Sequence, residues 1–366
     1  MIGRSDSVQT YIIAEAGVNH NGSLAMAKEL INKATEAGVD AVKFQTFKAE
    51  KLVTKSAMQA EYQIQNLGEE VSQYEMLKKL ELTYSEFIEL KEYCEVKNIT
   101  FLSSPFDKES VDFLIKELQL PVIKISSGEL NNAPLLHYIS NFKVKLILST
   151  GMAEMKEVHN ALAVIAYGLA QKDIISLDEV NHFYESELAK KLLKDYVTIL
   201  HCTTEYPTPP TEVNLRAINY LKSKLELPVG FSDHSEGISI PIAAVAAGAE
   251  VIEKHFTLNR DLPGPDHKAS LEPLELAEMV KGIRIVEKAL GNPIKEPTES
   301  EIKNKKVARK SLVAATTIKK GDVLTEDNIT VKRPGVGISP FQYWDLLGRK
   351  SKKDYQEDEL LHEDSK

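Results

Sequence analysis

The sequence has few of the features that mark secreted or membrane proteins. Its 366 residues include two cysteines, Cys94 and Cys202, and neither has a second cysteine at CxxC spacing, which argues against a disulfide framework. The longest apolar stretch, around residues 240–249, is far shorter than the ~20 residues that span a bilayer. The N-terminal segment lacks the apolar core of a signal peptide. We therefore expect a cytoplasmic protein with reduced thiols and no membrane partner.

Excess positive charge is also absent. The formal net charge is −9, and an acidic surface repels phosphate backbones, so a nucleic-acid partner is disfavoured. An anionic small substrate remains compatible with this balance if the site itself is basic. A hydrophobic content of 43% and a charged content of 27% are ordinary for a globular protein. The length suffices for one large core and a smaller second domain.

Short apolar or β-branched runs recur along the first 290 residues, separated by amphipathic helical stretches. Residues 23–37, for example, place apolar side chains at i, i+3 and i+4 before Gly38. Repeated strand–helix units predict an α/β fold, a (β/α)8 TIM barrel. A doubly wound open sheet fits less well, because no Gly-rich phosphate loop follows the first run. The eight runs are Tyr11–Ala14, Ala41–Phe44, Thr100–Leu102, Val122–Ile125, Leu146–Leu148, Val197–Leu200, Val229–Phe231 and Val251–Ile252.

Polar or charged residues lie at the end of every one of these runs or just after it. In a barrel all eight strand ends lie at one face, where the active site forms. Although strands commonly end in polar loops, this pattern at all eight ends favours a site. The residues are Glu15, Lys43, Gln45, Ser103, Ser104, Lys124, Ser127, Glu129, Ser149, His201, Asp233, His234, Lys254 and His255.

Two long segments interrupt the strand–helix repeat, and the repeat itself ends near residue 290. Residues 48–82 are predicted to be a partly helical lid or dimer element, and residues 168–195 add helical pattern. We expect a barrel domain over residues 1–290 and a linker over residues 291–306, which have no apolar period. Residues 307–366 then predict a small β-rich domain with turns at Lys320–Gly321 and Pro334–Gly335.

The residues at the strand ends suggest metal and anion binding. His234 and His255 follow neighbouring strands, and two adjacent imidazoles suit Mn²⁺, Fe²⁺ or Zn²⁺; the alternative is structural, hydrogen-bonded histidines. Lys43 and Lys124 suit a phosphate or carboxylate, or else pair with strand-end carboxylates. Ser127, Ser149 and Ser232 could donate further hydrogen bonds. Glu15 and Glu129 could hold sugar hydroxyls or transfer protons.

Several ordered motifs resemble the sialic acid synthase family. The resemblance covers nearly the whole chain, including the C-terminal SAF (antifreeze-like) domain. The motifs are IIAEAGVNHNG at 12–22, AVKFQTF at 41–47, SSPFD at 103–107, KISSGELNN at 124–132, STGM at 149–152, HCTTEYPTP at 201–209, GFSDHSEG at 230–237, EKHFTLNRDLPGPDH at 253–267 and VKRPGVG at 331–337.

The resemblance implies a metal-dependent condensation of phosphoenolpyruvate with an N-acetylmannosamine-like sugar. The metal, expected to be Mn²⁺ with Mg²⁺ or Co²⁺ as alternatives, would be held by His234 and His255. Glu129 matches a glutamate suspected of proton transfer, and Arg333 matches an arginine that a partner subunit inserts in a domain-swapped homodimer. The remaining matches are Lys43, Lys124, Ser127, Ser149 and Ser232 for phosphoenolpyruvate and Glu15, Gln45, Tyr206 and Asp266 for the sugar.

The identity of the sugar is less constrained. Where some family members have an asparagine that contacts phosphate, this chain has Thr204, followed by Glu205. The TTEYP form resembles a subgroup that includes synthases of legionaminic acid. Our primary prediction is an N-acetylneuraminate synthase, with N,N'-diacetyllegionaminate synthase as the alternative.

Some of these residues would also suit other functions. A Schiff-base aldolase would use Lys124 or Lys254. A barrel metallohydrolase is disfavoured because no HxH pair follows the first run, and a carbohydrate-binding module without catalysis is disfavoured by the lysines, histidines and glutamates together.

Overall fold

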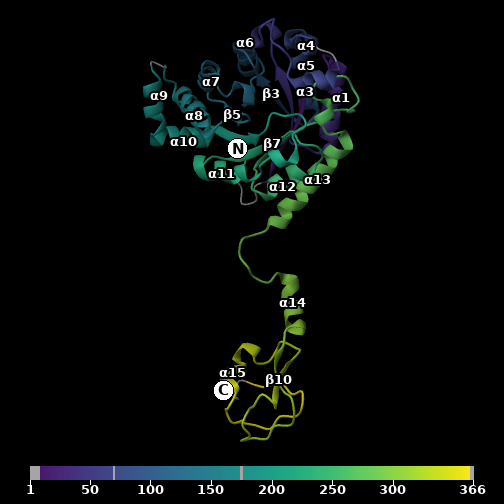
Figure 1. The fold of residues 1–366 in the computed structure, drawn as a ribbon, viewed down its shortest axis with the longest axis vertical. Coiled ribbons are helices and arrows are strands. Elements are labelled where there is room, and N and C mark those ends of the chain that lie inside the picture. Colours follow the sequence, from purple (N-terminus) through teal and green to yellow (C-terminus); the bar gives the residue numbers. More distant parts are fainter. Residues whose placement is uncertain (1–8, 69–70, 174–175, 363–366) are drawn as a thin grey trace. The chain divides into compact units, whose positions relative to one another are not determined.

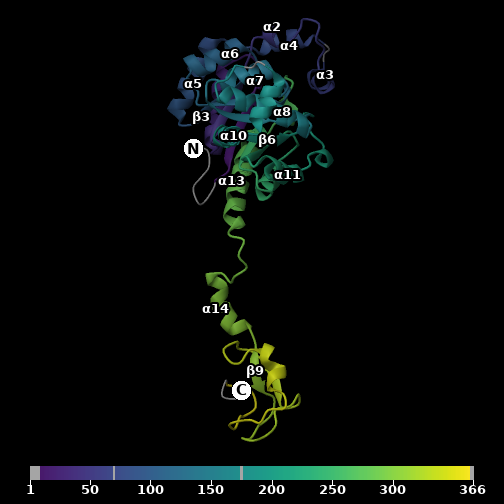
Figure 2. The same ribbon diagram turned by 90° about the vertical axis from the view of Figure 1, so that its left-hand side faces the viewer.

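A computed structural model describes residues 9–68, 71–173 and 176–362. The chain divides into two compact units, Met1–Gly291 and Asn292–Lys366, and each is described by itself. Figures 1 and 2 show the first unit as a set of strands surrounded by helices. No helix among the described residues is both long enough and apolar enough to cross a membrane.

The first unit is the predicted (β/α)8 barrel. Its hydrogen-bonded strand order is β3-β2-β1-β8-β7-β6-β5-β4, and every pairing is parallel. The two ends of this order, β3 and β4, contact each other, so the strands surround a common interior. The strands are β1 Tyr11–Gly17, β2 Ala41–Thr46, β3 Thr100–Pro105, β4 Val122–Ile125, β5 Lys145–Ser149, β6 Val197–Cys202, β7 Val229–Asp233 and β8 Val251–His255.

Helices pack around the strands because their apolar faces cover the outward side chains. Helix α1 (Leu24–Ala37) begins where the Ser23 side chain accepts a hydrogen bond from the Met26 amide, and it ends at Gly38, whose φ is 77°. The other outer helices are α5 Tyr84–Lys97, α6 Lys108–Asp112, α7 Ala133–Ser140, α8 Met155–Leu169, α11 Arg216–Leu225, α12 Ser239–Ala246 and α13 Pro273–Leu290. The π-helix η1 Phe113–Glu117 continues α6.

Both long segments that interrupt the repeat contain helices. Residues 48–82 form α2 (Ala49–Leu52), α3 (Glu61–Leu67) and α4 (Gln73–Leu80). Residues 168–195 contribute the end of α8, then α9 (Leu177–Tyr184) and most of α10 (Glu187–Tyr196).

The barrel has two apolar layers, one inside and one outside the strands. Side chains alternate along a strand, so Ile12 and Ala14 pack in the outer cluster with the helices, while Ile13 points inward. The inner layer is a ring of buried side chains, which we call the apolar ring: Ile13, Ala41, Leu102, Ile147, Leu200 and Val251. This ring fills the barrel below the site.

The second unit has its own small core. Strands β9 (Ser311–Ala314) and β10 (Ile329–Lys332) pair antiparallel, and Leu312, Leu324 and Tyr355 are among the side chains that pack together. The short elements η5 (Pro340–Gln342) and α15 (Tyr343–Leu346) follow. The segment that we expected to be a linker contains helix α14 (Glu299–Ala308), which starts at a capping box between Thr298 and Glu301 and has no buried residue.

Candidate active site

A ring of polar side chains lies two residues beyond the apolar ring. Residues two apart on a strand point to the same side, so these side chains also face the barrel interior. All of them are buried. The members of this polar ring are Glu15, Lys43, Ser104, Lys124, Ser149, Cys202, Ser232 and Glu253.

Two lysines and two glutamates of the polar ring are paired. Lys43 forms an ion pair with Glu15, and its Nζ lies 3.8 Å from Glu253 Oε2. Lys124 Nζ lies 3.4 Å from Glu253 Oε1, which also accepts a 2.9 Å hydrogen bond from the Ser232 hydroxyl. The predicted anion-binding lysines thus lie in one network, and in this state both contact carboxylates.

Burial and neighbouring charge shift the pKa values of the two glutamates in opposite directions. Burial raises the pKa of Glu15 to about 7, against the opposing effect of Lys43. Burial also opposes ionisation of Glu253, but Lys124 and Lys43 together outweigh it and hold the pKa of Glu253 below its usual value. Burial lowers the pKa of Lys124. Glu253 is therefore the carboxylate that remains charged beside both lysines.

His234 and His255 lie next to each other above the polar ring, as their strand positions predict. Their ring centroids are 5.3 Å apart, and burial lowers the pKa of both, to about 4 for His234. His234 Nδ1 hydrogen-bonds the carbonyl oxygen of Thr203, so Nδ1 carries the proton and Nε2 keeps its lone pair. His255 Nδ1 is buried without a hydrogen-bond partner.

These two neutral imidazoles fit a divalent metal ion. An oriented imidazole whose other nitrogen bonds a backbone carbonyl is the usual metal-ligand arrangement. Among the described residues there is no group of three or more His, Cys, Asp or Glu side chains that could hold a metal. The fit is therefore to a two-histidine site whose remaining positions would be open to water or substrate.

Small polar groups surround Ser127, which follows the strand that carries Lys124. The Ser127 hydroxyl accepts a 3.0 Å hydrogen bond from the Gly151 amide and lies 3.2 Å from the Cys202 sulfur. A Cβ at Gly151 would come within 2.8 Å of both Ser127 Oγ and Thr204 Cγ2, so only glycine fits there. Ser149 Oγ is buried without a hydrogen-bond partner. An unpartnered donor in the same ring as the two lysines suits an anionic ligand.

Aromatic and acidic side chains line the mouth of the barrel. Tyr206 lies 4.2 Å from His234 and 5.0 Å from Tyr62 of α3, measured between ring centroids. Gln45 donates a 3.2 Å hydrogen bond to Glu15. Burial raises the pKa of Asp266 to about 6, an effect that Lys43 opposes. The predicted sugar-binding positions therefore include groups with apolar faces and groups that exchange protons near neutral pH.

Helix α3 reaches this mouth from the segment predicted to be a lid or dimer element. The Asn66 side chain donates a 2.6 Å hydrogen bond to the Pro265 carbonyl, and Lys268 donates one to the Gln65 carbonyl. These contacts place Tyr62 beside Tyr206. Neither Tyr62 nor its role was predicted, because it lies in a polar segment without an apolar period.

Two predicted site residues are not joined to this network. Glu129, on η2 (Ser127–Glu129), is buried and accepts a 2.6 Å hydrogen bond from Asn132, and burial raises its pKa. Across the described ranges, no hydrogen bond or ion pair links it to the two histidines or to Lys43 and Lys124. Arg333 is exposed in the second unit. The roles of both remain predictions.

Several of the polar residues noted at the strand ends do not face the barrel interior. His201 hydrogen-bonds the Val213 carbonyl at 2.8 Å. Lys254 and Asp233 form a 2.7 Å ion pair on the outer side of the strands, because they alternate with the inward-facing Glu253 and Ser232. Ser103 likewise alternates with Ser104 and bonds the Phe44 carbonyl. Of the two lysines considered for a Schiff base, only Lys124 faces the interior.

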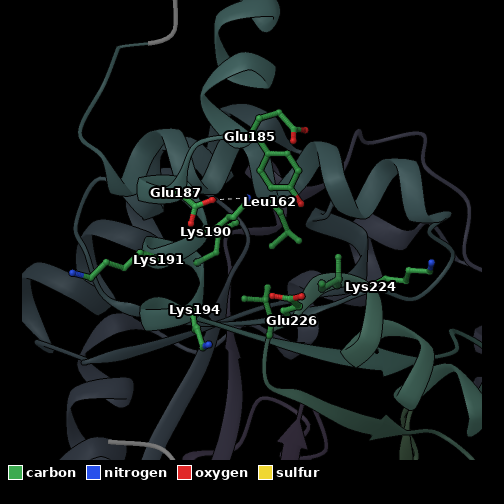
Figure 3. Close-up of a pocket in the computed structure, with 12 residues that line it drawn as sticks. Leu162, Glu185, Glu187, Lys190, Lys191, Lys194, Lys224 and Glu226 are labelled. Carbon is green, nitrogen blue, oxygen red and sulfur yellow. Dashed lines mark hydrogen bonds and ion pairs between the residues drawn. The ribbon is translucent and has the colours of Figure 1, made fainter.

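A separate groove of about 500 Å³ lies between α8, α10 and the segment before β7 (Figure 3). It is lined by charged side chains such as Lys190, Lys194 and Glu226 and by Leu162. Lys194 and Glu226 precede β6 and β7, so this groove lies toward the amino ends of the strands. The polar ring and the histidines lie toward the carboxyl ends and are the candidate site.

The fold and the site together define a barrel that brings two lysines and two imidazoles to one mouth, and comparison with known proteins assigns this barrel to a family. The NeuB family model matches residues 30–295, and the SAF domain model matches residues 309–365. The chain belongs to the NeuB family, whose members are nonulosonic acid synthases that condense phosphoenolpyruvate with a sugar.

Individual relatives support this assignment. An N,N'-diacetyllegionaminic acid synthase of Campylobacter jejuni is 48% identical, with 97% of this chain and 99% of that protein covered. A protein of the same name from Legionella pneumophila is 43% identical, with 94% and 91% covered. The crystal structure of an N-acetylneuraminic acid synthetase from Leptospira borgpetersenii has a TM-score of 0.66 and 35% identity, with 81% and 90% covered.

Proposed function

We propose that this protein is an N,N'-diacetyllegionaminate synthase, which condenses phosphoenolpyruvate with 2,4-diacetamido-2,4,6-trideoxymannose and releases phosphate. The observation that carries the choice of sugar is the 48% and 43% identity to two proteins with that name. This reverses our primary prediction from the sequence, N-acetylneuraminate synthase, in favour of its alternative. The Tyr62–Tyr206 pair also suits a 6-deoxy sugar, because a methyl group packs on an aromatic face where a hydroxyl would need a partner.

The anionic substrate is held by residues of the polar ring together with Ser127. Lys43 and Lys124 bind the carboxylate and phosphate of phosphoenolpyruvate, and Ser127, Ser149 and Ser232 donate hydrogen bonds to them. Thr204 lies against Gly151 at the edge of this group. The two lysines also stabilise charge as the phosphate departs.

The sugar binds in its open-chain form at the mouth, where Glu15, Gln45, Tyr206 and Asp266 hold its hydroxyl and acetamido groups. His234 and His255 would hold the divalent metal, expected to be Mn²⁺, which when bound polarises the C1 aldehyde as a Lewis acid. C3 of phosphoenolpyruvate bonds to C1 of the sugar, water adds at C2, and phosphate leaves by C–O cleavage. Glu129 is the proposed group for proton transfer.

We further propose that the working form is a domain-swapped homodimer. In this arrangement Arg333 of one chain binds the N-acetyl group of the sugar in the barrel of a second chain. Its support is the match of VKRPGVG at 331–337 to the family motif and the exposed position of Arg333 in the second unit.

A substrate comparison tests the proposed sugar. Purified protein with Mn²⁺ and phosphoenolpyruvate receives N-acetylmannosamine in one reaction and 2,4-diacetamido-2,4,6-trideoxymannose in another, and phosphate release and product mass are followed. We expect kcat/KM to be at least about tenfold higher for the second sugar, a difference of about 1.4 kcal/mol in transition-state binding. A preference for N-acetylmannosamine would restore our primary prediction.

The same samples distinguish the aldolase alternative. Burial lowers the pKa of Lys124, and a neutral amine is what a Schiff base requires. If the protein were a Schiff-base aldolase, borohydride treatment in the presence of pyruvate would leave a stable adduct on Lys124. For the proposed synthase we expect mass spectrometry to find no adduct.

A further inference from the structure

Glu253 has a position that the proposed chemistry does not yet use. It is nearly fully buried and contacts both lysines of the polar ring, through Oε1 to Lys124 and through Oε2 to Lys43. Glu15 forms an ion pair with Lys43 but not with Lys124. Within the polar ring, Glu253 is therefore the carboxylate that bridges the two cations.

The two carboxylate oxygens of Glu253 differ in their hydrogen bonding. Oε1 accepts a hydrogen bond from Ser232 at 2.9 Å and lies 3.4 Å from Lys124. Oε2 is buried without any hydrogen bond and lies 3.8 Å from Lys43. A buried carboxylate oxygen that lacks a hydrogen bond is costly, so this pairing is incompletely satisfied.

We propose that Glu253 is a positioning residue that serves as a built-in counter-anion: it pairs with Lys43 and Lys124 in the free enzyme, and an incoming phosphate or carboxylate must compete with it for them. This inference rests on the anion site of the proposed function. A buried lysine without a counter-anion is costly. Without Glu253, Lys124 would lose its ion-pair partner and Lys43 would keep Glu15, and a bound substrate anion supplies the negative charge that Glu253 supplies before binding.

The competition has two consequences for turnover. It weakens the binding of every anion at the lysines, including the product phosphate. It also provides a partner to which both lysines return when phosphate leaves. Loss of the negative charge at residue 253 should therefore tighten phosphate binding and slow product release.

The test measures the Kd of inorganic phosphate for the metal-free full-length protein, by calorimetry at constant ionic strength. Glu253→Gln keeps the shape and can still accept from Ser232, so we expect phosphate to bind about tenfold more tightly than to the wild type. The matched control is Asp233→Asn, which removes the counter-anion of the buried Lys254. Lys254 is the residue after Glu253 on β8, and its side chain points to the outer side of the barrel. The control should leave the phosphate Kd within about twofold.

Equal or weaker phosphate binding by Glu253→Gln would overturn the proposal, and so would the same tightening in Asp233→Asn. If Glu253→Gln cannot be recovered folded, Glu253→Asp decides by the same titration, because a shorter side chain loosens both lysine contacts. It should tighten phosphate binding by about threefold, and an unchanged Kd would overturn the proposal. Failure of the proposed function would appear separately, as wild-type protein that forms no sugar acid in the substrate comparison.

Discussion

The two rings inside the barrel use the same strands for opposite purposes. The apolar ring, for example Leu200, fills the interior and supplies stability, whereas the polar ring two residues further on buries charges that cost stability. Ile13 and Glu15 on β1, and Val251 and Glu253 on β8, show the change within one strand. Both rings are buried, so burial alone does not identify the residues of the site. The direction of a side chain and its position along the strand distinguish site residues from residues that only stabilise the barrel.

The largest expected effect comes from removing a histidine above the polar ring. His234→Ala should lower metal-dependent turnover by at least about 10³-fold, roughly 4 kcal/mol, because one of the two proposed metal ligands is lost. Its thermal stability should change little. Turnover with and without added Mn²⁺ after chelation checks this. The matched control is His201→Ala, whose side chain bonds the Val213 carbonyl. Full activity of His234→Ala after metal removal would contradict the role.

A change in the apolar ring should have the opposite profile. Leu200→Ala creates a cavity and should lower the free energy of unfolding by about 3 kcal/mol. KM values for both substrates should stay near those of the wild type in protein that remains folded, because Leu200 lies below the site. Denaturant unfolding and steady-state kinetics measure both quantities. A large change in KM with an unchanged free energy of unfolding would contradict the claim that the apolar ring contributes stability and not substrate binding.

The pH dependence of stability tests whether a buried charge at the mouth of the barrel, that of Asp266, costs stability as the charges of the polar ring do. Because burial raises the pKa of Asp266 from 3.8 to about 6, the folded state binds its proton more tightly than the unfolded state. The stability that this residue contributes is present below pH 3.8 and is lost as the pH rises through about 6.

Asp266→Asn should therefore gain stability relative to the wild type between pH 4 and pH 8, by about 3 kcal/mol from the size of the shift. Its activity should fall if Asp266 binds the sugar as proposed. Unfolding of the metal-free proteins at several pH values gives the difference directly. A stability difference that does not vary with pH would show that folding does not raise the pKa of Asp266.

The smallest effect is expected at Arg333. Arg333→Ala should raise KM for the sugar by about tenfold, roughly 1.4 kcal/mol, and change KM for phosphoenolpyruvate much less. Lys332→Ala, its exposed neighbour, is the matched control. Equal increases in both KM values would argue against a contact with the N-acetyl group.

The strand starts were predictable from sequence, and the strand ends were less so. Seven of the eight strands extend past the predicted run, as β8 does from Ile252 to His255, because inward-facing polar residues break the apolar pattern while the ladder continues. For the same reason Glu253 was missed although its neighbours Lys254 and His255 were noticed. The signal that could have found it is the period of two counted from Val251.

Other features had no local signal. Helix α14 buries no residue, and its two large apolar side chains, Ile302 and Val307, are exposed, so no apolar period marked it. Tyr62 comes to the mouth through contacts of Asn66 and Gln65 with residues about 200 positions away, which no local pattern contains. By contrast, the pairing of His234 with His255 followed from their places on neighbouring strands.

The most direct test of the account is the binding of phosphoenolpyruvate alone, measured by calorimetry on metal-free protein. The inner lysine is removed in Lys124→Met, and the outer ion pair is removed as a whole in the double variant Asp233→Asn with Lys254→Met, which leaves no unpaired charge. We predict that the wild type and the outer double variant bind phosphoenolpyruvate with similar Kd and that Lys124→Met loses binding by at least about a hundredfold. Unchanged binding to Lys124→Met would contradict the claim that the polar ring is the anion site.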